Sequence, residues 1–324
     1  MKRENIKKRS KKLKRAEIIF MIVMLFVPMF YHILNTYVLG FYNLFFTFQR
    51  YDGDGNLFWV GLDNFRIAWQ LITGGETSLV AVGLRRSILV WCIQNVVMFP
   101  VTMILCLYLA NRKPGTQFFK FIFMIPTMMT GLIVAQVFIA FVEDPLPQFV
   151  DLVSDKGFIY FIQDPSKAFG TLLTFMLWSG FGSIMIVYPN AMNAIDKNMV
   201  EASQIDGATH LQQLWHVYLP GIWPTITVIY FGAFGSLFTA DLPNFMFYGY
   251  NAPVETYTLG YYIFKQTMGG GDNIAPVLNA LSYMISFVAI PLTMGWKYIA
   301  ENYGPSEDEV KYKKKKLVDI YENR

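Results

Sequence analysis

Long hydrophobic runs alternate along this chain with shorter polar segments. A membrane-spanning helix needs about 20 predominantly apolar residues to cross a hydrocarbon layer of about 30 Å. Six runs meet this requirement: residues 18–39, 87–110, 121–142, 168–191, 222–248 and 274–296. Asp241 is the only charged residue within them. The pattern therefore predicts an all-α polytopic membrane protein with six transmembrane helices.

The first hydrophobic run follows a basic start, as a secretory signal peptide would. Its apolar part is longer than that of a signal peptide, and it lacks a small-residue cleavage site. We therefore expect a retained first helix. Residues 50–86 mix Gly, Asp and Asn with aromatic residues. This composition favours a small ordered cap or an interfacial segment over a disordered linker.

The composition excludes a water-soluble enzyme. Of the 324 residues, 54% are hydrophobic and 15% charged, whereas soluble domains carry about 45–50% and about 25%. The two cysteines, Cys92 and Cys106, lie too far apart on one predicted helix to form a disulfide. The sequence has no phosphate-binding loop of the Gly-x-x-x-x-Gly-Lys-Ser/Thr type, and its three histidines have no metal-ligand spacing. We expect no catalytic residue, cofactor or metal in this chain.

Basic residues are distributed unequally between the two sides of the predicted membrane region. Of the 27 Lys and Arg residues, twenty lie in the two ends of the chain and in the two loops on the same side, and seven lie on the other side. Because basic flanks stay in the cytoplasm during insertion, both termini are predicted to be cytoplasmic. The basic ends lack the interleaved aromatic residues of a nucleic-acid site, and contact with the anionic lipid surface accounts for them.

The segment between the fourth and fifth hydrophobic runs, residues 192–221, has the pattern of two short helices. Asp196 is suited to cap a helix over residues 197–206, and Gly207 allows the left-handed conformation that ends a helix. Thr209 is placed to cap a second helix, which ends near Pro220. The apolar residues expected on one face of the first helix are Met199, Val200, Ala202 and Ile205.

This segment resembles the signature of the permease subunits of binding-protein-dependent ABC importers. That signature is Glu-Ala-Ala, three residues, Gly, nine residues, Ile, one residue and Leu-Pro. The chain has Glu201-Ala202-Ser203, then Gly207, Val217 and Leu219-Pro220 at the same spacing. The resemblance implies a coupling loop that contacts the ATPase through Glu201, Ala202, Ser203, Asp206, Gly207, Leu219 and Pro220.

Three further stretches resemble the carbohydrate branch of this family. They are residues 205–208, residues 59–65 (Trp-Val-Gly-Leu-Asp-Asn-Phe), and Phe238 with Asp241-Leu242 near the end of the fifth run. The chain departs from the branch after this aspartate, because residues 248–253 replace the usual Thr-x-Gly-Gly-Pro. We therefore do not assign to residues 248–253 the role that this loop has in the carbohydrate branch.

The resemblance implies an ABC importer permease (MetI-like) fold in a bacterial cytoplasmic, or inner, membrane. The chain would form half of a pore beside a second permease subunit, above two ATP-binding-cassette ATPases that hold ATP and Mg²⁺. An extracytoplasmic solute-binding protein would deliver a sugar. The expected organisation is a basic cytoplasmic tail (1–17), a first helix with an extracytoplasmic segment (18–84), a permease core containing the coupling loop (85–300) and a second basic tail (301–324).

Sugars are bound by hydrogen-bonding groups and flat aromatic surfaces, and polar residues within membrane helices usually face a cavity or the bundle interior. The candidates for the sugar path are Asn95, Gln136, Trp178, Asp241, Asn279 and Tyr283. For each of them a helix–helix hydrogen bond or an interfacial anchor is the alternative. Two other functions remain open: a secondary transporter, although the sequence shows no internal repeat, and a membrane scaffold or assembly protein.

Overall fold

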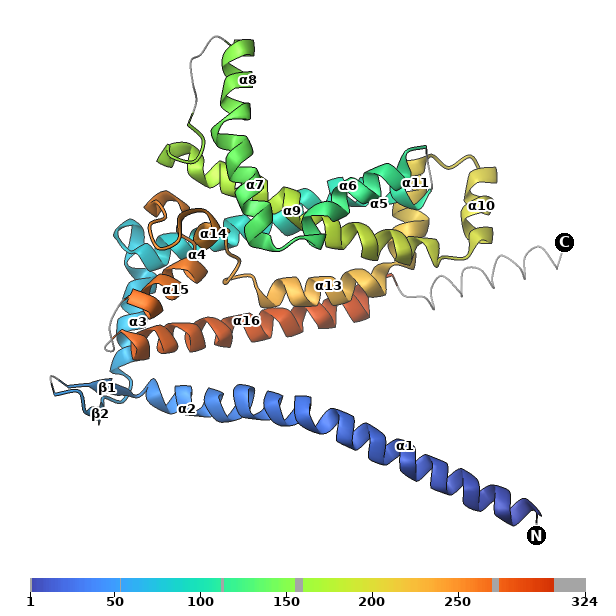
Figure 1. Cartoon of the computed structure of the whole chain (residues 1–324), viewed down its shortest axis with the longest axis horizontal. Helices are drawn as coiled ribbons and strands as arrows, with labels where there is room; N and C mark the ends of the chain where they lie inside the picture. Colours follow the sequence, from blue (N-terminus) through green and yellow to red (C-terminus); the bar gives the residue numbers. More distant parts are fainter. Residues whose placement is uncertain (1, 53, 112–113, 155–159, 270–273, 306–324) are drawn as a thin grey trace. The chain divides into compact units, whose positions relative to one another are not determined.

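The computed structural model describes residues 2–52, 54–111, 114–154, 160–269 and 274–305. Residue contacts divide the chain into two compact units, Met1–Trp69 with Gly270–Tyr283 and Gln70–Gly269 with Met284–Arg324. Apart from one two-stranded sheet, the elements in the described ranges are helical (Figure 1).

The first unit begins with a long helix and ends in a small cap. Its elements are α1 (Lys2–His32), the π-helical turn η1 (Ile33–Val38), α2 (Leu39–Phe46), β1 (Gln49–Tyr51), β2 (Leu57–Trp59), the first part of α3 (Asp63–Thr73) and the first part of α16 (Ala275–Tyr303). The strands are antiparallel, with Arg50 opposite Phe58. Asn64 is fully buried and donates hydrogen bonds to Thr47 O (2.8 Å) and Gln49 O (2.9 Å). The expected ordered cap is therefore confirmed.

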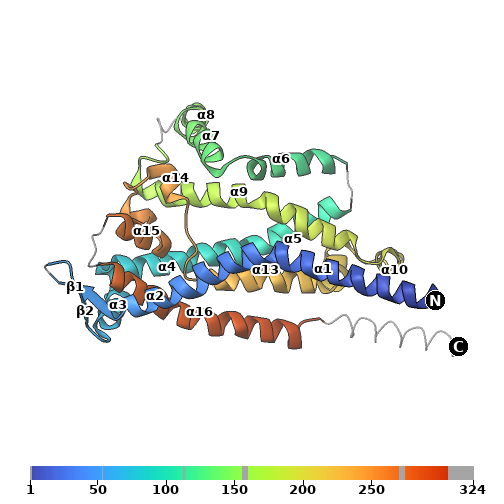
Figure 2. The ribbon, with the colours of Figure 1, turned by 60° about the horizontal axis from the view of Figure 1, so that its bottom comes forward.

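The second unit holds most of the helices. They are η2 (Gly75–Thr77), α4 (Leu79–Cys92), η3 (Ile93–Val97), α5 (Met98–Ala110), α6 (Thr116–Met128), α7 (Gly131–Glu143), α8 (Pro145–Ser154), α9 (Pro165–Asn193), α10 (Lys197–Ile205), α11 (His210–Gln213), η4 (Leu214–Tyr218), α12 (Leu219–Gly221), α13 (Trp223–Gly235), α14 (Asn244–Tyr248), η5 (Val254–Thr256), α15 (Leu259–Gly269) and most of α16 (Ala275–Tyr303). The long helix α9 packs against both α5 and α6 (Figure 2).

Five helical segments of the described chain are long and apolar enough to cross a membrane: Glu17–Phe46, Leu79–Ala110, Gly131–Val153, Pro165–Asn193 and Ala275–Tyr303. A sixth is counted if His210–Gly221 and Trp223–Gly235, which meet at an angle of 75°, form one bent span. The predicted all-helical polytopic fold is thus confirmed, with differences in the third and fifth spans.

The third predicted span is wrong as a continuous helix. α6 ends at Met128, Met129 and Thr130 are extended, and α7 begins at Gly131. Pro126 lies in the last turn of α6, where its missing amide hydrogen removes a helical hydrogen bond. Hydrophobicity continues through this break, so the apolar run gives no sign of it.

The fifth predicted span, residues 222–248, is also interrupted. α13 ends at Gly235, residues 236–239 form turns, and residues 240–243 are irregular before α14 begins. The amide of Leu242 donates to the Asp241 carboxylate (2.8 Å) instead of to a helical carbonyl. Pro243, next to the first residue of α14, has no amide hydrogen to donate. The predicted helix therefore consists of two short helices and a non-helical linker.

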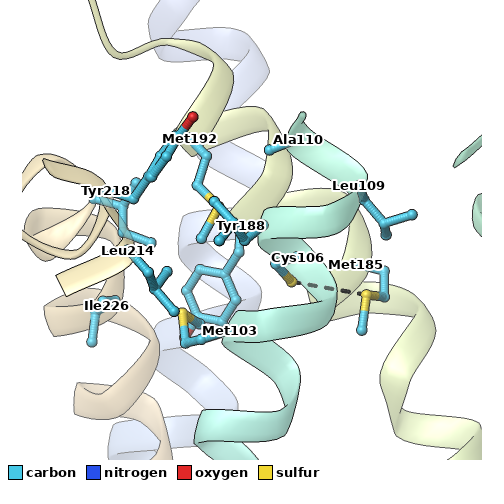
Figure 3. Close-up of a cluster of buried hydrophobic side chains, with 12 residues drawn as sticks. Met103, Cys106, Leu109, Ala110, Met185, Tyr188, Met192, Leu214, Tyr218 and Ile226 are labelled. Carbon is cyan, nitrogen blue, oxygen red and sulfur yellow. Dashed lines mark hydrogen bonds between the residues drawn. The ribbon is translucent and has the colours of Figure 1, made fainter. Parts of the chain in front are cut away.

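A hydrophobic core joins α5, α9 and the segment from η4 to α13. Its fully buried members include Met103, Tyr188 and Ile222, and Tyr188 is among the largest of the fully buried side chains. In Figure 3 the side chains of α5 and α9 meet those of η4, and Cys106 Sγ lies 3.8 Å from Met185 Sδ. This core, referred to below as the α5–α9–η4 core, fixes one end of α9 to the segment predicted to carry the coupling loop.

Candidate functional site

The two helix breaks meet at one pocket. Residues of α6, α7, α9, the α13–α14 linker and α14 line an open pocket of about 280 Å³, here called the helix-break pocket. Its lining residues are Pro126, Gly131, Val134, Phe175, Met176, Ser179, Asp241, Leu242, Pro243 and Met246. Non-helical backbone at membrane depth is tolerated where it is buried in protein or lines a cavity. The breaks in α6–α7 and α13–α14 fit that condition, because both contribute to this pocket.

Asp241 is the charged residue of the helix-break pocket. Its side chain is exposed on this chain. The carboxylate accepts hydrogen bonds from the Thr258 hydroxyl and from the Leu242 amide. A Cβ atom on Gly260 would lie 3.3 Å from Asp241 Oδ2, so the start of α15 packs closely against this carboxylate. Among the described residues its hydrogen-bond partners are thus neutral groups, and neither recorded ion pair includes it.

Aromatic rings form one wall beside the pocket. Phe175 lies 5.1 Å from Phe138 and 5.0 Å from Phe247 between ring centroids. Trp178, which is 38% exposed, stacks on Phe138 at 6.0 Å and 27°. We call Phe138, Phe175, Trp178 and Phe247 the aromatic cluster. An apolar cavity with a few fixed polar groups, here Ser179 and Asp241, is the usual form of a small-molecule site.

The other predicted path residues lie elsewhere. The side-chain amide of Asn95 in η3 donates to Trp91 O (3.0 Å). The backbone carbonyl of Asn95 accepts from the Tyr230 hydroxyl (2.5 Å), and this bond connects η3 to α13. Tyr283 in α16 donates to Gly40 O (2.7 Å), and Asn279 lies one turn before it. Gln136 is exposed on α7, outside the pocket lining. Asp241 and Trp178 are therefore the predicted residues that the fold brings to this region.

Sequence reasoning missed Phe175, Ser179 and Met246, which line the helix-break pocket with Asp241. Phe175 and Met246 read as ordinary apolar residues of a span. The available signal was the position of Pro126 and Pro243 inside predicted helices, because a proline in a membrane helix marks a place where the backbone can open.

The predicted coupling loop forms the expected pair of short helices. The Asp196 side chain accepts from Asn198 N (3.0 Å) at the start of α10. Gly207 follows α10 with φ of 77°. Thr209 and Gln212 form a reciprocal capping box at the start of α11. These features confirm the predicted helix caps at Asp196 and Thr209 and the predicted left-handed conformation of Gly207.

The outer surface of this loop is rich in exposed residues. Glu201, Ala202 and Asp206 are exposed, as is Gly207. Ile205 is 86% exposed and Ala202 is exposed as well, so this part of the predicted apolar face of α10 is not covered within this chain. In this chain Val200 packs on the α5–α9–η4 core, whereas Ile205 points away from it. Leu211 and Trp215 add further exposed apolar surface, at 56% and 60%.

The inner side of the loop is firmly held. Leu214 and Tyr218 are buried in the α5–α9–η4 core, and the Tyr218 hydroxyl donates to Asn111 Oδ1 (3.1 Å). Leu219 packs against the same core. The Ser203 hydroxyl donates to Val200 O (2.6 Å), and Pro220 is half-buried. The loop is thus a rigid projection with one side anchored and the other exposed.

The comparisons with known proteins decide the family. The profile described as "Binding-protein-dependent transport system inner membrane component" matches residues 83–295. The chain belongs to this family. Its members are permeases, the pore subunits of ABC transporters rather than enzymes, and this permease is therefore an inner-membrane component. Membership also sets aside the two alternatives, a secondary transporter and a scaffold protein.

Relatives and solved structures agree with this membership. The permease is 27% identical over 280 residues to the multiple sugar-binding transport system permease protein MsmF of Streptococcus mutans, covering 83% of this chain and 93% of that protein. It is 23% identical over 273 residues to the probable starch degradation products transport system permease protein AmyD of Thermoanaerobacterium thermosulfurigenes, covering 81% and 88%.

Among solved structures, a chain of a bacterial alginate ABC transporter in complex with an alginate pentasaccharide-bound periplasmic protein superimposes with a TM-score of 0.73. It is 18% identical in sequence, and the match covers 90% of this chain and 98% of that one. The permease therefore shares the fold of that transporter chain, as the predicted MetI-like fold requires.

Proposed function

We propose that this permease forms half of the pore of an ATP-driven importer for a carbohydrate, most simply an oligosaccharide. The names of the relatives MsmF and AmyD, which refer to sugars and starch degradation products, support this substrate class. A second permease subunit completes the pore. Two ATPase subunits bind ATP and Mg²⁺ and hydrolyse the nucleotide, and an extracytoplasmic solute-binding protein delivers the sugar. Both termini lie in the cytoplasm.

The helix-break pocket is proposed as this chain's part of the sugar path. The observation that carries the proposal is the meeting of two broken helices at a pocket lined by Asp241, Ser179 and Phe175, with the other rings of the aromatic cluster packed beside Phe175. The Ser179 hydroxyl and the Asp241 carboxylate offer hydrogen bonds to sugar hydroxyls, while the rings offer flat apolar faces. Of the predicted path residues, Asp241 and Trp178 are retained. The bond from the Tyr283 hydroxyl to Gly40 O supports the helix-packing alternative for Tyr283, whereas the Asn95 side chain bonds the preceding helical turn at Trp91 O.

The exposed side of α10 is proposed as the contact with an ATPase subunit. Glu201, Ala202, Asp206 and Gly207 are exposed there, and Ile205 lacks packing within this chain. Ser203, Leu219 and Pro220 hold the loop in shape from its inner side. A rigid projection transmits displacement, whereas a flexible loop would absorb it. The ATPase drives the switch only through its different affinities for the two conformations of the permease.

Uptake tests this proposal. Cells lacking this chain are compared with complemented cells for import of a panel of radiolabelled oligosaccharides, and the tagged permease is purified to identify the subunits that accompany it. We expect the deletion to abolish import of at least one sugar, and an ATPase and a second permease to copurify. Unchanged import of the whole panel, or a permease purified without an ATPase, would contradict the proposal.

A further inference from the structure

A second cavity lies on the same pair of helices as the helix-break pocket. It has a volume of about 420 Å³ and is here called the α7–α9 cavity. Its lining residues are Phe138, Val142, Leu146, Phe161, Lys167, Gly170, Thr171 and Thr174. None of these residues belongs to the predicted sugar path or to the coupling loop.

The two cavities are neighbours along α9 and share the aromatic cluster. Phe138 lines the α7–α9 cavity and Phe175 lines the helix-break pocket, with their ring centroids 5.1 Å apart. Thr174 and Ser179, one from each cavity, are separated by about 7.5 Å along the axis of α9 and by about 140° around it, at 1.5 Å and 100° per residue. Phe138 and Phe175 thus form the boundary between the two cavities, and a chain of linked units that contacts both has to pass over these rings.

The polar groups of the α7–α9 cavity suit hydroxyl-bearing ligands. The Thr174 hydroxyl donates to Gly170 O (2.8 Å) and the Thr171 hydroxyl donates to Phe161 O (3.1 Å), which leaves the oxygen lone pairs of both as acceptors. Lys167 Nζ has three N–H donors, one of which is directed to Asp164 Oδ2 at 2.8 Å. The remaining lining is aromatic or aliphatic.

The charges around this cavity cancel. Asp164 precedes α9, where its carboxylate accepts from the amide and hydroxyl of Ser166 and pairs with Lys167. The hydrogen bond from Lys167, followed by those from Ser166, lowers the pKa of Asp164 to about 2. The ion pair is therefore complete at neutral pH, and Lys167 does not present an uncompensated positive charge. In the helix-break pocket the ionisable group is an acid, Asp241.

We infer that the α7–α9 cavity is a second sugar subsite, and that together with the helix-break pocket it selects an uncharged oligosaccharide over one carrying carboxylates. A uronate unit would meet the Asp241 carboxylate in one cavity and a neutralised lysine in the other. An uncharged unit meets the Ser179 hydroxyl, the Asp241 acceptor and the Phe175 ring in the helix-break pocket, and threonine hydroxyls, the Lys167 N–H donors and aromatic rings in the α7–α9 cavity. This inference rests on the proposed sugar-import function and specifies its substrate class.

Gly170 permits a selective test. Nothing lies within 4 Å of a Cβ atom placed on it, so the Cβ of Gly170→Leu meets no neighbour and the rest of the side chain occupies space beside the cavity lining. Gly180 is equally open, lies on the same helix and lines neither cavity, so Gly180→Leu is the matched control. Thr174→Val removes one hydroxyl at nearly constant volume and serves as a second variant.

The measurement is the rate of uptake, at saturating concentration, of radiolabelled gluco-, xylo- and galacturono-oligosaccharides of two and four units. The binding protein is the same for all variants, so a change that depends on sugar length reports on this chain. We expect import of a neutral series. We also expect Gly170→Leu to slow uptake of the four-unit sugar about tenfold more than uptake of the two-unit sugar. This factor corresponds to the loss of one typical hydrogen bond between the longer sugar and the blocked cavity. Thr174→Val acts in the same direction, and Gly180→Leu leaves the ratio of four-unit to two-unit uptake rates unchanged.

Three results would overturn the inference. Wild-type import restricted to the galacturonate series contradicts the charge selection. A Gly170→Leu variant whose ratio of four-unit to two-unit uptake rates matches that of wild type contradicts the second subsite. Absence of uptake for every sugar in wild-type cells contradicts the proposed function itself, and is thereby distinguished from failure of the subsite.

Discussion

The hydroxyl of Thr258 connects Asp241 to the first turn of α15. It donates a hydrogen bond to the Asp241 carboxylate and accepts one from Tyr261 N (3.5 Å). The next residue, Leu259, donates through its amide to Ser87 Oγ (3.1 Å) in α4. A Cβ atom on Gly83 would lie only 3.1 Å from Leu259 N, so α4 and α15 are in close backbone contact. The charged group of the helix-break pocket is thus held in place by two neighbouring helices.

The charge and the tether of Asp241 can be separated by mutation. Asp241→Asn keeps an acceptor for Thr258 but removes the charge, so we expect reduced sugar uptake in an assembled complex with measurable ATPase activity. Thr258→Val keeps the charge but removes the tether, and a hydrogen bond to a charged group contributes about 1.5–3 kcal/mol. We expect Thr258→Val to lower the thermal stability of the purified permease. If Asp241→Asn prevents assembly, the carboxylate is structural.

Gly207 is expected to be sensitive to residues that disfavour positive φ. Its φ of 77° costs an ordinary L-residue about 1–2 kcal/mol, and more for a β-branched one. Gly207→Val should distort the turn between α10 and α11 and reduce sugar uptake about tenfold at equal expression. Gly207→Asn is the matched control, since asparagine tolerates this region. Equal uptake by the two variants would contradict a conformational requirement at this position.

Glu201 is expected to act through its charge. It is exposed on α10, and the proposed ATPase contact places it against a basic group of that subunit. Glu201→Lys replaces attraction by repulsion, and like charges at an interface cost several kcal/mol. We expect loss of uptake and of sugar-stimulated ATPase activity, with normal pairing of the two permeases. Glu201→Gln, which removes only the attraction, should retain more uptake. Wild-type uptake by Glu201→Lys would mean that this surface is not the contact.

Gly182 allows α6 and α9 to approach each other closely. A Cβ atom there would collide with the Phe123 carbonyl oxygen and the Thr127 side chain, whereas nothing lies within 4 Å of a Cβ on Gly180. Overpacking of this kind costs about 1–3 kcal/mol. Gly182→Ala should therefore lower the melting temperature in detergent, and Gly180→Ala should leave it unchanged or raise it. Equal melting temperatures would argue against tight α6–α9 packing.

The orientation of the chain in the membrane is a further prediction. The excess of basic residues on one side predicts that both termini are cytoplasmic. Reporter fusions after residue 324 and near residue 155 should report opposite compartments. The same compartment for both fusions would contradict a six-span arrangement.

The sequence predicted local structure well where the determining groups are close together along the chain. The caps by Asp196 and Thr209 and the positive φ of Gly207 depend on bonds spanning two to four residues. The membrane-spanning character followed from hydrophobic length. Both predictions depend only on residues that lie close together in the sequence.

The helix breaks and the helix-break pocket could not be predicted in this way. Hydrophobicity continues across Met129–Thr130 and across residues 236–240, because lipid and protein interiors both accept apolar side chains. The contact of Asp241 with Thr258 joins residues 17 positions apart. The exposure of Ile205 depends on packing against other segments, and an apolar pattern alone does not reveal whether a partner is needed to cover it.

If an ATPase subunit pushes on the coupling loop as proposed, the 75° angle between His210–Gly221 and α13 sets the direction of the transmitted force. A push along the axis of His210–Gly221 is directed mostly across α13, so it tilts that helix rather than driving it along its own axis like a piston. Ile222, at the corner, is 1% exposed and therefore moves with the surrounding core. At the opposite end of α13, residues 236–243 are outside any helix. Changes in their backbone torsions can absorb such a tilt, so in the proposed mechanism a rocking of α13 would reshape the wall around Asp241 while the helices themselves stay intact.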